Sequence, residues 1–259
     1  MARRTTTSAG VILSHLEFDL LWADLGPGGP PPHPFDVAAH GRTHAERDDL
    51  GVRVFASLAE AGLTDGDDVS AELADLFTVL GSPTLSVDAL VLGDAPWRLL
   101  AAVRDGMGVL AVLDERDLVL EPLRPAGVVP AVVRMLGEQP PGPGEQLRLP
   151  RAAYTAAMDA YARSGYDAFE RALVTAGITG RAVRPLATLA TAERYAAGQL
   201  GATGPAGRAP VLAWFDTAAG RYAVTPEDAG GEPWVMVTPA DVSWLADRLT
   251  RMLDAARTS

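Results

Sequence analysis

Leucines recur at helical spacing near the start of the chain. One helical face of residues 13–25 would carry Leu13, Leu16, Leu20 and Leu21. Ser14 stands three residues before Glu17, the spacing of a capping box, so the helix should begin there. The following stretch GPGGPPPHP, residues 26–34, cannot continue a helix because proline lacks the amide donor. The pattern predicts a helix over 13–25 and then a Pro-rich bridge.

A second apolar face predicts a helix over 43–62. Thr43 and Glu46 repeat the capping spacing at its start, and Gly62 is suited to end it. A third helix is expected over 67–80.

The pattern then changes to short apolar runs separated by turn residues, which is typical of strands. Four strands of an antiparallel meander are predicted at 84–92, 97–103, 108–113 and 117–123. Helical spacing returns over 125–137. The segment 137–148, which contains GEQPPGPGE, is rich in Pro and Gly and is interpreted as a linker.

After this linker the order of elements repeats. Helices are predicted over 154–177 and 181–199, and a Gly/Pro loop over 201–210. Strands are predicted at 211–216, 220–226 and 233–239, and a closing amphipathic helix at 240–256.

Short sequence matches support a duplication. LAEAGLT at 58–64 and LVTAGIT at 173–179 share four of seven residues, and PAGV at 125–128 matches PADV at 239–242. At a similar offset, Gly106 falls on Gly220 and Arg134 on Arg248. We interpret the chain, residues 1–259, as one domain made of two related halves, about 13–136 and 149–253. The predicted fold class is α+β: a central antiparallel sheet flanked by two helical bundles with quasi-two-fold symmetry.

The amino-acid composition excludes several classes of function. The formal net charge is −11, which opposes binding to nucleic acid or to an anionic membrane surface. The chain has no Cys and no Lys, so thiolate, disulfide, P-loop lysine and Schiff-base chemistry are excluded. The N-terminal apolar run is broken by His15, Glu17 and Asp19, and no window is long enough for a membrane span. We expect a cytoplasmic protein with a short loose start.

Residues for catalysis or metal binding do not form a recognisable pattern. His40 and His44 stand four apart but lack the glutamate of a zinc-protease motif, and Thr43 is the better helix cap, so exposed loop histidines are the favoured interpretation. The segment GATGPAG at 201–207 resembles a phosphate loop only loosely, because it precedes a predicted strand and contains Pro205. We therefore assign no catalytic residue, no metal ligand and no cofactor.

Taken together, a series of motifs in order resembles the EspG chaperones of type VII (ESX) secretion in actinobacteria. The motifs are LEFDLLWADLG at 16–26 with the Pro-rich bridge, Thr43-x-x-Glu46-Arg47, AGL at 61–63, GQ at 198–199, RAP at 208–210, DTAAGRY at 216–222 and W-x-x-V-x-P-A-D at 234–241. The resemblance covers about 13–253.

The resemblance implies a cytosolic chaperone without catalytic activity. Members bind PE–PPE heterodimers, mainly the PPE subunit, and cover an aggregation-prone apolar tip until the secretion machinery accepts the cargo. It also implies that the loop between the second and third strands and the C-terminal helical bundle contact the partner. Mapped onto the predicted meander, that loop is 104–108. The predicted partner-binding residues are Arg104, Asp105, Met107, Gln199 and Trp244.

Two other functions stay open at this stage. The chain could be a non-catalytic adaptor for a different partner, which an unbiased pull-down would reveal. An enzyme would require a deep pocket in which carboxylates converge. The sequence does not define the oligomeric state.

Overall fold

The computed structural model describes residues 10–180, 183–229 and 231–258. In this part of the chain the α-helices are α1 (His15–Leu25), α2 (His44–Glu60), α3 (Ala71–Gly81), α4 (Val128–Leu136), α5 (Arg151–Ser164), α6 (Tyr166–Thr175), α7 (Val183–Thr191) and α8 (Val242–Arg257). A short 3-10 turn, Pro125–Gly127, precedes α4.

The strands of the main sheet are β1 (Val11–Ser14), β4 (Leu85–Gly93), β5 (Trp97–Arg104), β6 (Met107–Leu113), β7 (Asp117–Leu123), β8 (Leu147–Pro150), β9 (Arg194–Gly204), β10 (Gly207–Arg208), β11 (Leu212–Thr217), β12 (Gly220–Ala229) and β13 (Glu232–Pro239). A separate small hairpin consists of β2 (Thr64–Asp65) and β3 (Asp68–Val69).

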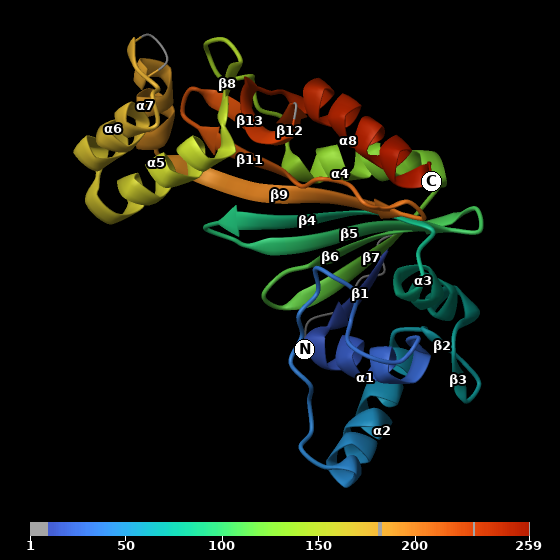
Figure 1. Cartoon of the computed structure of the whole chain (residues 1–259). Coiled ribbons are helices and arrows are strands. Elements are labelled where there is room, and N and C mark those ends of the chain that lie inside the picture. The colour runs from blue at the N-terminus through green and yellow to red at the C-terminus, as the bar shows by residue number, and fades with distance from the viewer. Residues whose placement is uncertain (1–9, 181–182, 230, 259) are drawn as a thin grey trace.

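One antiparallel sheet runs through the whole molecule (Figure 1). Its order is β1-β7-β6-β5-β4-β9-β11-β12-β13-β8, with β10 added to β9. The two halves of the chain meet at β4 and β9, where Ala89 pairs with Leu200. From this junction outward, the strands of both halves follow in the same chain order, and the first strand of each half ends at the sheet edge. The predicted antiparallel sheet is confirmed.

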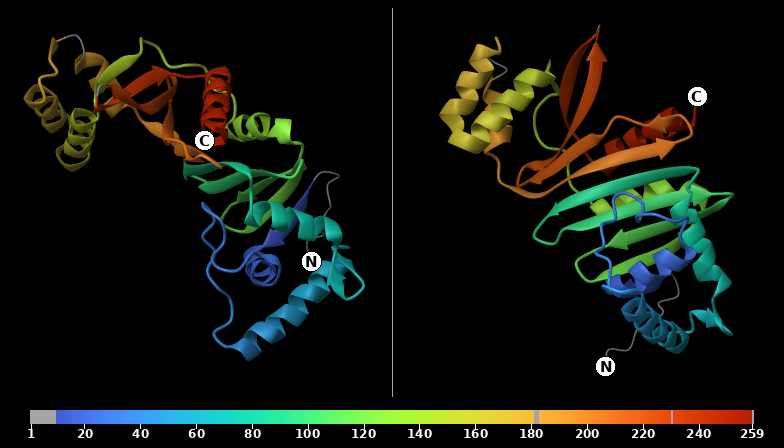
Figure 2. Two further views of the ribbon diagram at one scale, coloured as in Figure 1. Left: turned by 45° about the vertical axis from the view of Figure 1, so that its right-hand side comes forward. Right: turned by 60° about the horizontal axis from the view of Figure 1, so that its bottom comes forward.

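Side chains on the two faces of the sheet pack against different helices. On one face, α4 and α8 cover the central strands through a cluster that includes Val87, Leu200, Trp214 and Leu249. On the other face, α1 and α3 cover β5, β6 and β7, and α2 packs against α1. At the other end of this face α5 covers β8 and β13, while α6 packs against α5 and α7 against α6. We call α1–α3 the first helix group and α5–α7 the second helix group. Figure 2 shows them at opposite ends of the sheet, which leaves the middle of this face less covered.

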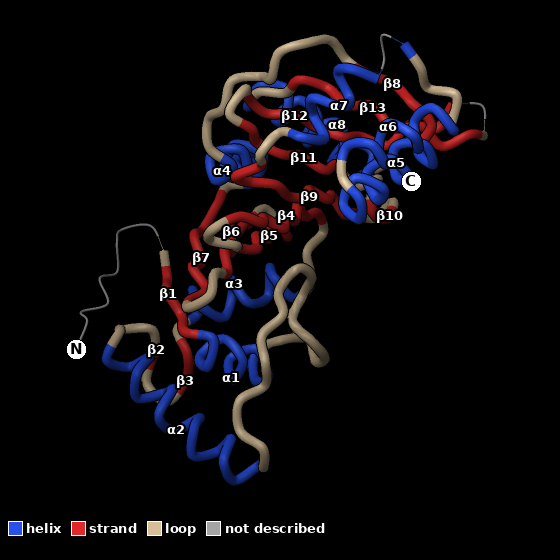
Figure 3. Tube along the Cα trace, turned by 90° about the vertical axis from the view of Figure 1, so that its left-hand side faces the viewer, coloured by secondary structure: helices blue, strands red, loops and turns tan. Residues whose placement is uncertain are grey.

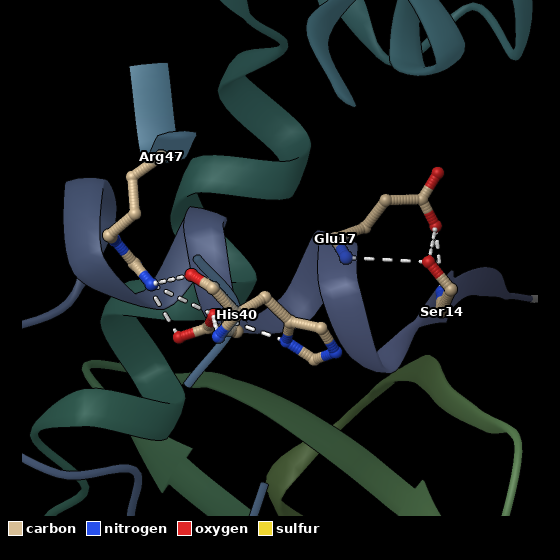
Figure 4. A network of polar contacts seen from close by, with 5 residues as sticks. Ser14, Glu17, His40 and Arg47 are labelled. Atoms are coloured by element: carbon tan, nitrogen blue, oxygen red, sulfur yellow. Dashed lines mark hydrogen bonds and ion pairs between the residues drawn. The ribbon is translucent and has the colours of Figure 1, made fainter. Parts of the chain in front are cut away.

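The predicted start of the first helix is confirmed. Ser14 is the N-cap of α1, and its hydroxyl accepts from the Glu17 amide while the Glu17 carboxylate accepts from the Ser14 amide at 2.7 Å. Glu17 is buried, and its other carboxylate oxygen accepts from the Ser57 hydroxyl of α2. The capping box, drawn in Figure 4, is therefore also tied to α2 through Ser57.

The Pro-rich bridge is fixed at its far end by a second polar network. The Asp19 carboxylate accepts from the His40 amide at 2.6 Å and from the Arg47 guanidinium at 3.0 Å. Arg47 also donates to the His40 carbonyl (Figure 4). Figure 3 shows the bridge as a long loop from α1 to the start of α2, and the network holds that start beside α1.

The segment 137–148 is packed more tightly than a free linker. Arg221 is fully buried on β12, where its guanidinium donates to both Asp216 oxygens at 2.7 and 2.9 Å. The same group donates to the Leu136 and Gly137 carbonyls at the end of α4. The Arg221 main chain bonds Pro140 and Gly142, and the last residues of the predicted linker, from Leu147, belong to β8. The predicted linker is thus a strap held against β12.

The repeated phrase adopts the same geometry at both places. Gly62 and Gly177 follow α2 and α6 with φ of 72° and 77°. In each copy the next residue's amide bonds the carbonyl of the buried first leucine: Leu63 to Leu58, and Ile178 to Leu173, both at 2.9 Å. This is the Schellman pattern of helix ends, in which the left-handed position favours glycine.

Several predicted boundaries were wrong. The helix expected from 67 begins at Ala71, because residues 64–69 form the β2–β3 hairpin. The helix expected over 154–177 is broken at Gly165, where φ is 72°. The largest error lies at 194–210. This stretch was predicted as helix and loop but forms β9 and β10, and β9 is the strand that joins the halves. Residues 181–182 lie outside the described residues.

Candidate protein-binding site

The β5–β6 hairpin carries three of the predicted partner-binding residues. Its turn is only two residues long: Asp105 has φ of 49° and Gly106 of 83°, which matches the turn type that two-residue hairpins favour. Arg104 donates to the Asp105 carboxylate at 3.1 Å and to the Ser82 carbonyl at 2.8 Å. Met107 is 43% exposed. The hairpin is therefore short and anchored to the end of α3.

Gln199 and Trp244 lie elsewhere. Gln199 is exposed on β9, between Leu90 of β4 and Ala213 of β11. Trp244 lies in the first turn of α8, where its amide donates to the Asp241 carboxylate, and its ring packs against the core on the opposite face of the sheet. The structure thus does not bring the predicted residues together: the hairpin, Gln199 and Trp244 are three separate places.

A groove lies on the less covered middle of the sheet, between the two helix groups. Its volume is about 740 Å³. We call it the central groove, and its principal lining residues are Leu90, Leu92, Trp97, Tyr154, Arg194, Gln199 and Phe215. It is therefore built from β4, β5, β9 and β11 and from the first helix of the second helix group.

The central groove has an apolar surface with a few ordered polar groups. Leu92, a lining residue from β4, is 64% exposed. The Arg194 guanidinium stacks over the Phe215 ring at 4.3 Å from its centre. Burial raises the pKa of the Tyr154 hydroxyl, an effect that the charge of Arg194 partly opposes, so this hydroxyl is neutral and can donate a hydrogen bond at neutral pH. Exposed apolar side chains beside aromatic rings and an arginine are typical of protein-binding surfaces.

Next to Gln199 the groove continues into a smaller hollow with an ion pair at its centre. The volume of this hollow is about 380 Å³. Arg208 binds the buried Asp88 carboxylate through two hydrogen bonds, of 2.6 and 2.8 Å, and these bonds raise the pKa of the guanidinium. Gly201 makes room for this pair, because a Cβ there would overlap the Arg208 guanidinium. This ion pair links β4 to β10 across β9. Because the Asp88 carboxylate is already bound by Arg208, it is not free to bind a ligand.

Sequence reasoning missed a contributor to the central groove. The chain forms β1 before the meander, so the second and third strands of the main sheet are β4 and β5. Their connection is residues 94–96, not 104–108. Pro96 and Trp97 at this connection line the central groove, whereas Met107 does not. The apolar run Val11–Leu13 was the signal that could have revealed β1.

The histidines singled out in the sequence have structural surroundings. His40 Nδ1 lies 3.2 Å from the Asp19 carboxylate, and His44 is the first residue of α2. Among the residues that the structure describes, no three His, Asp or Glu side chains gather in a way that could hold a metal ion. None of the described helices is long and apolar enough to cross a membrane.

Comparison with known proteins places the fold in a family. The family model described as EspG family matches residues 14–251. Of the solved structures, the type VII secretion system chaperone EspG5 of Mycobacterium tuberculosis, determined in complex with a PE25–PPE41 dimer, aligns with a TM-score of 0.72 and 19% sequence identity. The alignment covers 95% of this chain and 96% of that chain. No curated protein sequence matches the chain. The match over nearly the whole chain shows that this protein belongs to the EspG family.

Proposed function

We propose that this protein is a chaperone of type VII secretion that binds a PE–PPE heterodimer, chiefly through its PPE subunit. The observation that carries the proposal is membership in the EspG family over residues 14–251, together with a fold like that of EspG5, which was solved with a PE25–PPE41 dimer. The chain would act in the cytosol and without catalysis. It would keep an apolar tip of its cargo covered until the secretion machinery accepts it.

The central groove is the surface that fits this role best. Exposed Leu92 of β4 offers apolar area in this groove, and Gln199 on the neighbouring strand β9 offers an amide for a hydrogen bond. The connection 94–96 and the second helix group flank the groove. An apolar tip that enters it would bury these side chains, at roughly 25 cal/mol per Å² of apolar surface removed from water.

The predicted contact residues divide by location. Gln199 would touch a partner in the central groove. Arg104, Asp105 and Met107 would need a partner that extends to the β5–β6 hairpin, and Trp244 would need one that reaches the α8 face. We therefore place the primary contact at the groove and keep the other four residues as a secondary, more distant set.

We further propose that the chain is one domain whose two halves arose by duplication and are related by quasi-two-fold symmetry, with a helical bundle flanking the sheet at each end. The mirrored strand order about β4 and β9 supports this, as do the matching bonds after Gly62 and Gly177. Val128 and Val242, the matched last residues of PAGV and PADV, each begin a helix. On this view, partner binding depends on the places where the halves differ.

Co-expression with a PE–PPE pair encoded beside the gene tests the function. We expect a soluble ternary complex from wild type. The variant Leu92→Arg should retain at least about tenfold less cargo, because it places a charge in the apolar contact. Val52→Arg is the matched control, since Val52 is also an exposed aliphatic residue, 73% exposed, but lies on α2 outside the groove. A cargo that stays soluble and unbound in the presence of this protein would refute the chaperone role, and equal loss in both variants would refute the groove.

A further inference from the structure

A second groove opens within the first helix group, between α1, α2 and the β2–β3 hairpin. Its volume is about 550 Å³, and it shares no lining residue with the central groove. We call it the α1–α2 groove. Its floor is apolar: Leu21, Val54 and Leu58 are buried, and four further side chains are half-exposed in it, namely Leu20, Leu25, Phe55 and Val69.

The corresponding place in the second helix group is closed. There α5 and α6 pack against each other far more extensively than α1 and α2 do. The cavity left among the helices of that group measures only about 10 Å³. In the first helix group, Gly51 also lines the groove from the interior of α2, and a Cβ there would meet no atom within 4 Å. Glycine inside a helix costs about 0.5–1 kcal/mol relative to alanine, so at this position the chain leaves the groove without a side chain although alanine would fit.

The rim of the α1–α2 groove is acidic. Asp24, Asp48, Asp67 and Asp68 are exposed lining residues, and within the described ranges none of them forms an ion pair. The cation at this rim, Arg47, is already bound to Asp19 and the His40 carbonyl. An incoming partner therefore meets four unpaired carboxylates around an apolar floor.

Most of the chain's net negative charge lies in the residues that form the first helix group and its surroundings. Residues 10–81 contain three Arg against thirteen Asp and Glu, a net charge of −10 out of −11 for the whole chain. Residues 151–194, which include the second helix group, contain six Arg against four Asp and Glu, a net charge of +2. The negative field is thus concentrated around the α1–α2 groove, where it would attract cationic partners and repel anionic ones.

We propose that the α1–α2 groove binds a basic amphipathic helix of a partner protein. The apolar face of such a helix would cover the half-exposed floor, in the helix-in-groove mode, and its Arg or Lys side chains would pair with the acidic rim. Because this groove and the central groove have separate linings, a cargo confined to the central groove would leave it open. It is therefore a second docking site, suited to a component that receives the loaded chaperone.

Designed peptides test this with the full chain. Two fluorescent peptides of about 18 residues, five helical turns, carry the same leucines at i, i+3, i+4 and i+7. The polar face is all Arg in one peptide and all Glu in the other. We expect fluorescence anisotropy to show binding of the basic peptide that weakens with salt, and at least about tenfold weaker binding of the acidic one.

Amino-acid substitutions locate the binding site, and a folding check on each variant excludes misfolding as the cause of lost binding. Asp67→Arg/Asp68→Arg should weaken binding of the basic peptide about tenfold, while the control Asp159→Arg/Asp247→Arg, which reverses two exposed carboxylates outside both grooves, should not change it. Gly51→Phe should fill the groove and weaken binding, whereas Gly51→Ala, which adds only a methyl group, should keep it. Circular dichroism checks that each variant is folded, and retention of the PE–PPE complex by the Asp67→Arg/Asp68→Arg variant separates this site from the proposed cargo site.

Equal affinity for the two peptides, no binding of either, or no effect of the groove variants would overturn the proposal. A concentration-dependent dimer of the wild-type chain that the Asp67→Arg/Asp68→Arg variant abolishes would overturn it in favour of a second copy as the occupant.

Discussion

Replacing Arg221 with methionine should destabilise the fold strongly. The guanidinium is fully buried and binds both oxygens of Asp216, two carbonyls at the end of α4, and the face of Trp214 at 5.0 Å. These contacts join β11, β12, α4 and the strap 137–148. Methionine keeps much of the side-chain volume but donates no hydrogen bond, so the Asp216 carboxylate would be left buried without a partner.

The magnitude follows from this geometry. Removing one member of a buried ion pair costs about 3–5 kcal/mol. For a chain of this size, each kcal/mol shifts the melting temperature by roughly 2–4 °C, which gives a fall of about 6–20 °C. The double variant Arg221→Met/Asp216→Leu removes the stranded charge and should recover part of this loss. The remaining cost, about 1–3 kcal/mol, reflects the Leu136 and Gly137 carbonyls that have lost their donor.

Urea unfolding followed by circular dichroism measures these differences in the free energy of unfolding. Arg148→Met is the matched control, because Arg148 forms an exposed ion pair with Glu227 and should lose no more than about 1 kcal/mol. A free energy of unfolding for Arg221→Met within 1 kcal/mol of wild type would refute the reasoning. So would a double variant that is less stable than the single one.

Three further predictions concern local structure. Ser14→Ala should cost about 1 kcal/mol in urea unfolding, because α1 loses its N-cap, and a stability equal to wild type would contradict the capping assignment. Gly62→Ala and Gly177→Ala should each cost about 1–2 kcal/mol, because both positions require positive φ, and clearly unequal losses would argue against equivalent roles in the two halves. Asp114 accepts amide hydrogen bonds from Arg116 and Asp117, chiefly the latter, which lower the pKa of its carboxyl below 3.8. This contribution is present above the unfolded pKa and is lost as the pH falls through the lowered one, so Asp114→Asn should show a weaker loss of stability in acid titrations, and an unchanged acid profile would contradict it.

Helices and strands whose caps, apolar runs and turn residues lie close together in the sequence were predicted correctly. The helix over 13–25 was recognisable because Ser14 and Glu17 cap it directly in sequence. The meander strands were predicted within a few residues, because their apolar runs and turn residues are contiguous. The repeated phrase identified two helix ends. In each copy the first leucine, the glycine with positive φ and the residue whose amide bonds back to that leucine lie within six residues.

Elements defined by distant partners were missed. β9 is rich in Ala and Gly, a composition that does not favour a strand, yet it lies at the centre of the sheet because β4 and β11 pair with it on both sides. The β1 strand was missed because it is four residues long and precedes a helix directly.

The predicted partner-binding residues lie at separate places in the structure, because their positions also depend on distant partners. Whether Gln199 and Trp244 share a face depends on the register of β9 and on the side of the sheet that α8 covers, and neither is encoded locally. Gln199 does line the central groove, but Leu92 and the connection 94–96 became candidates only once β4 and β9 were seen to be neighbours.

The central claim is that this protein is a chaperone for a PE–PPE dimer. The most direct test mixes the purified chain with a purified PE–PPE dimer from the same genome and measures mass by light scattering during size-exclusion chromatography. We predict one peak that is 27.1 kDa heavier than the dimer, corresponding to one copy of this chain per dimer. Separate elution of the chain and the dimer at concentrations well above micromolar would contradict it.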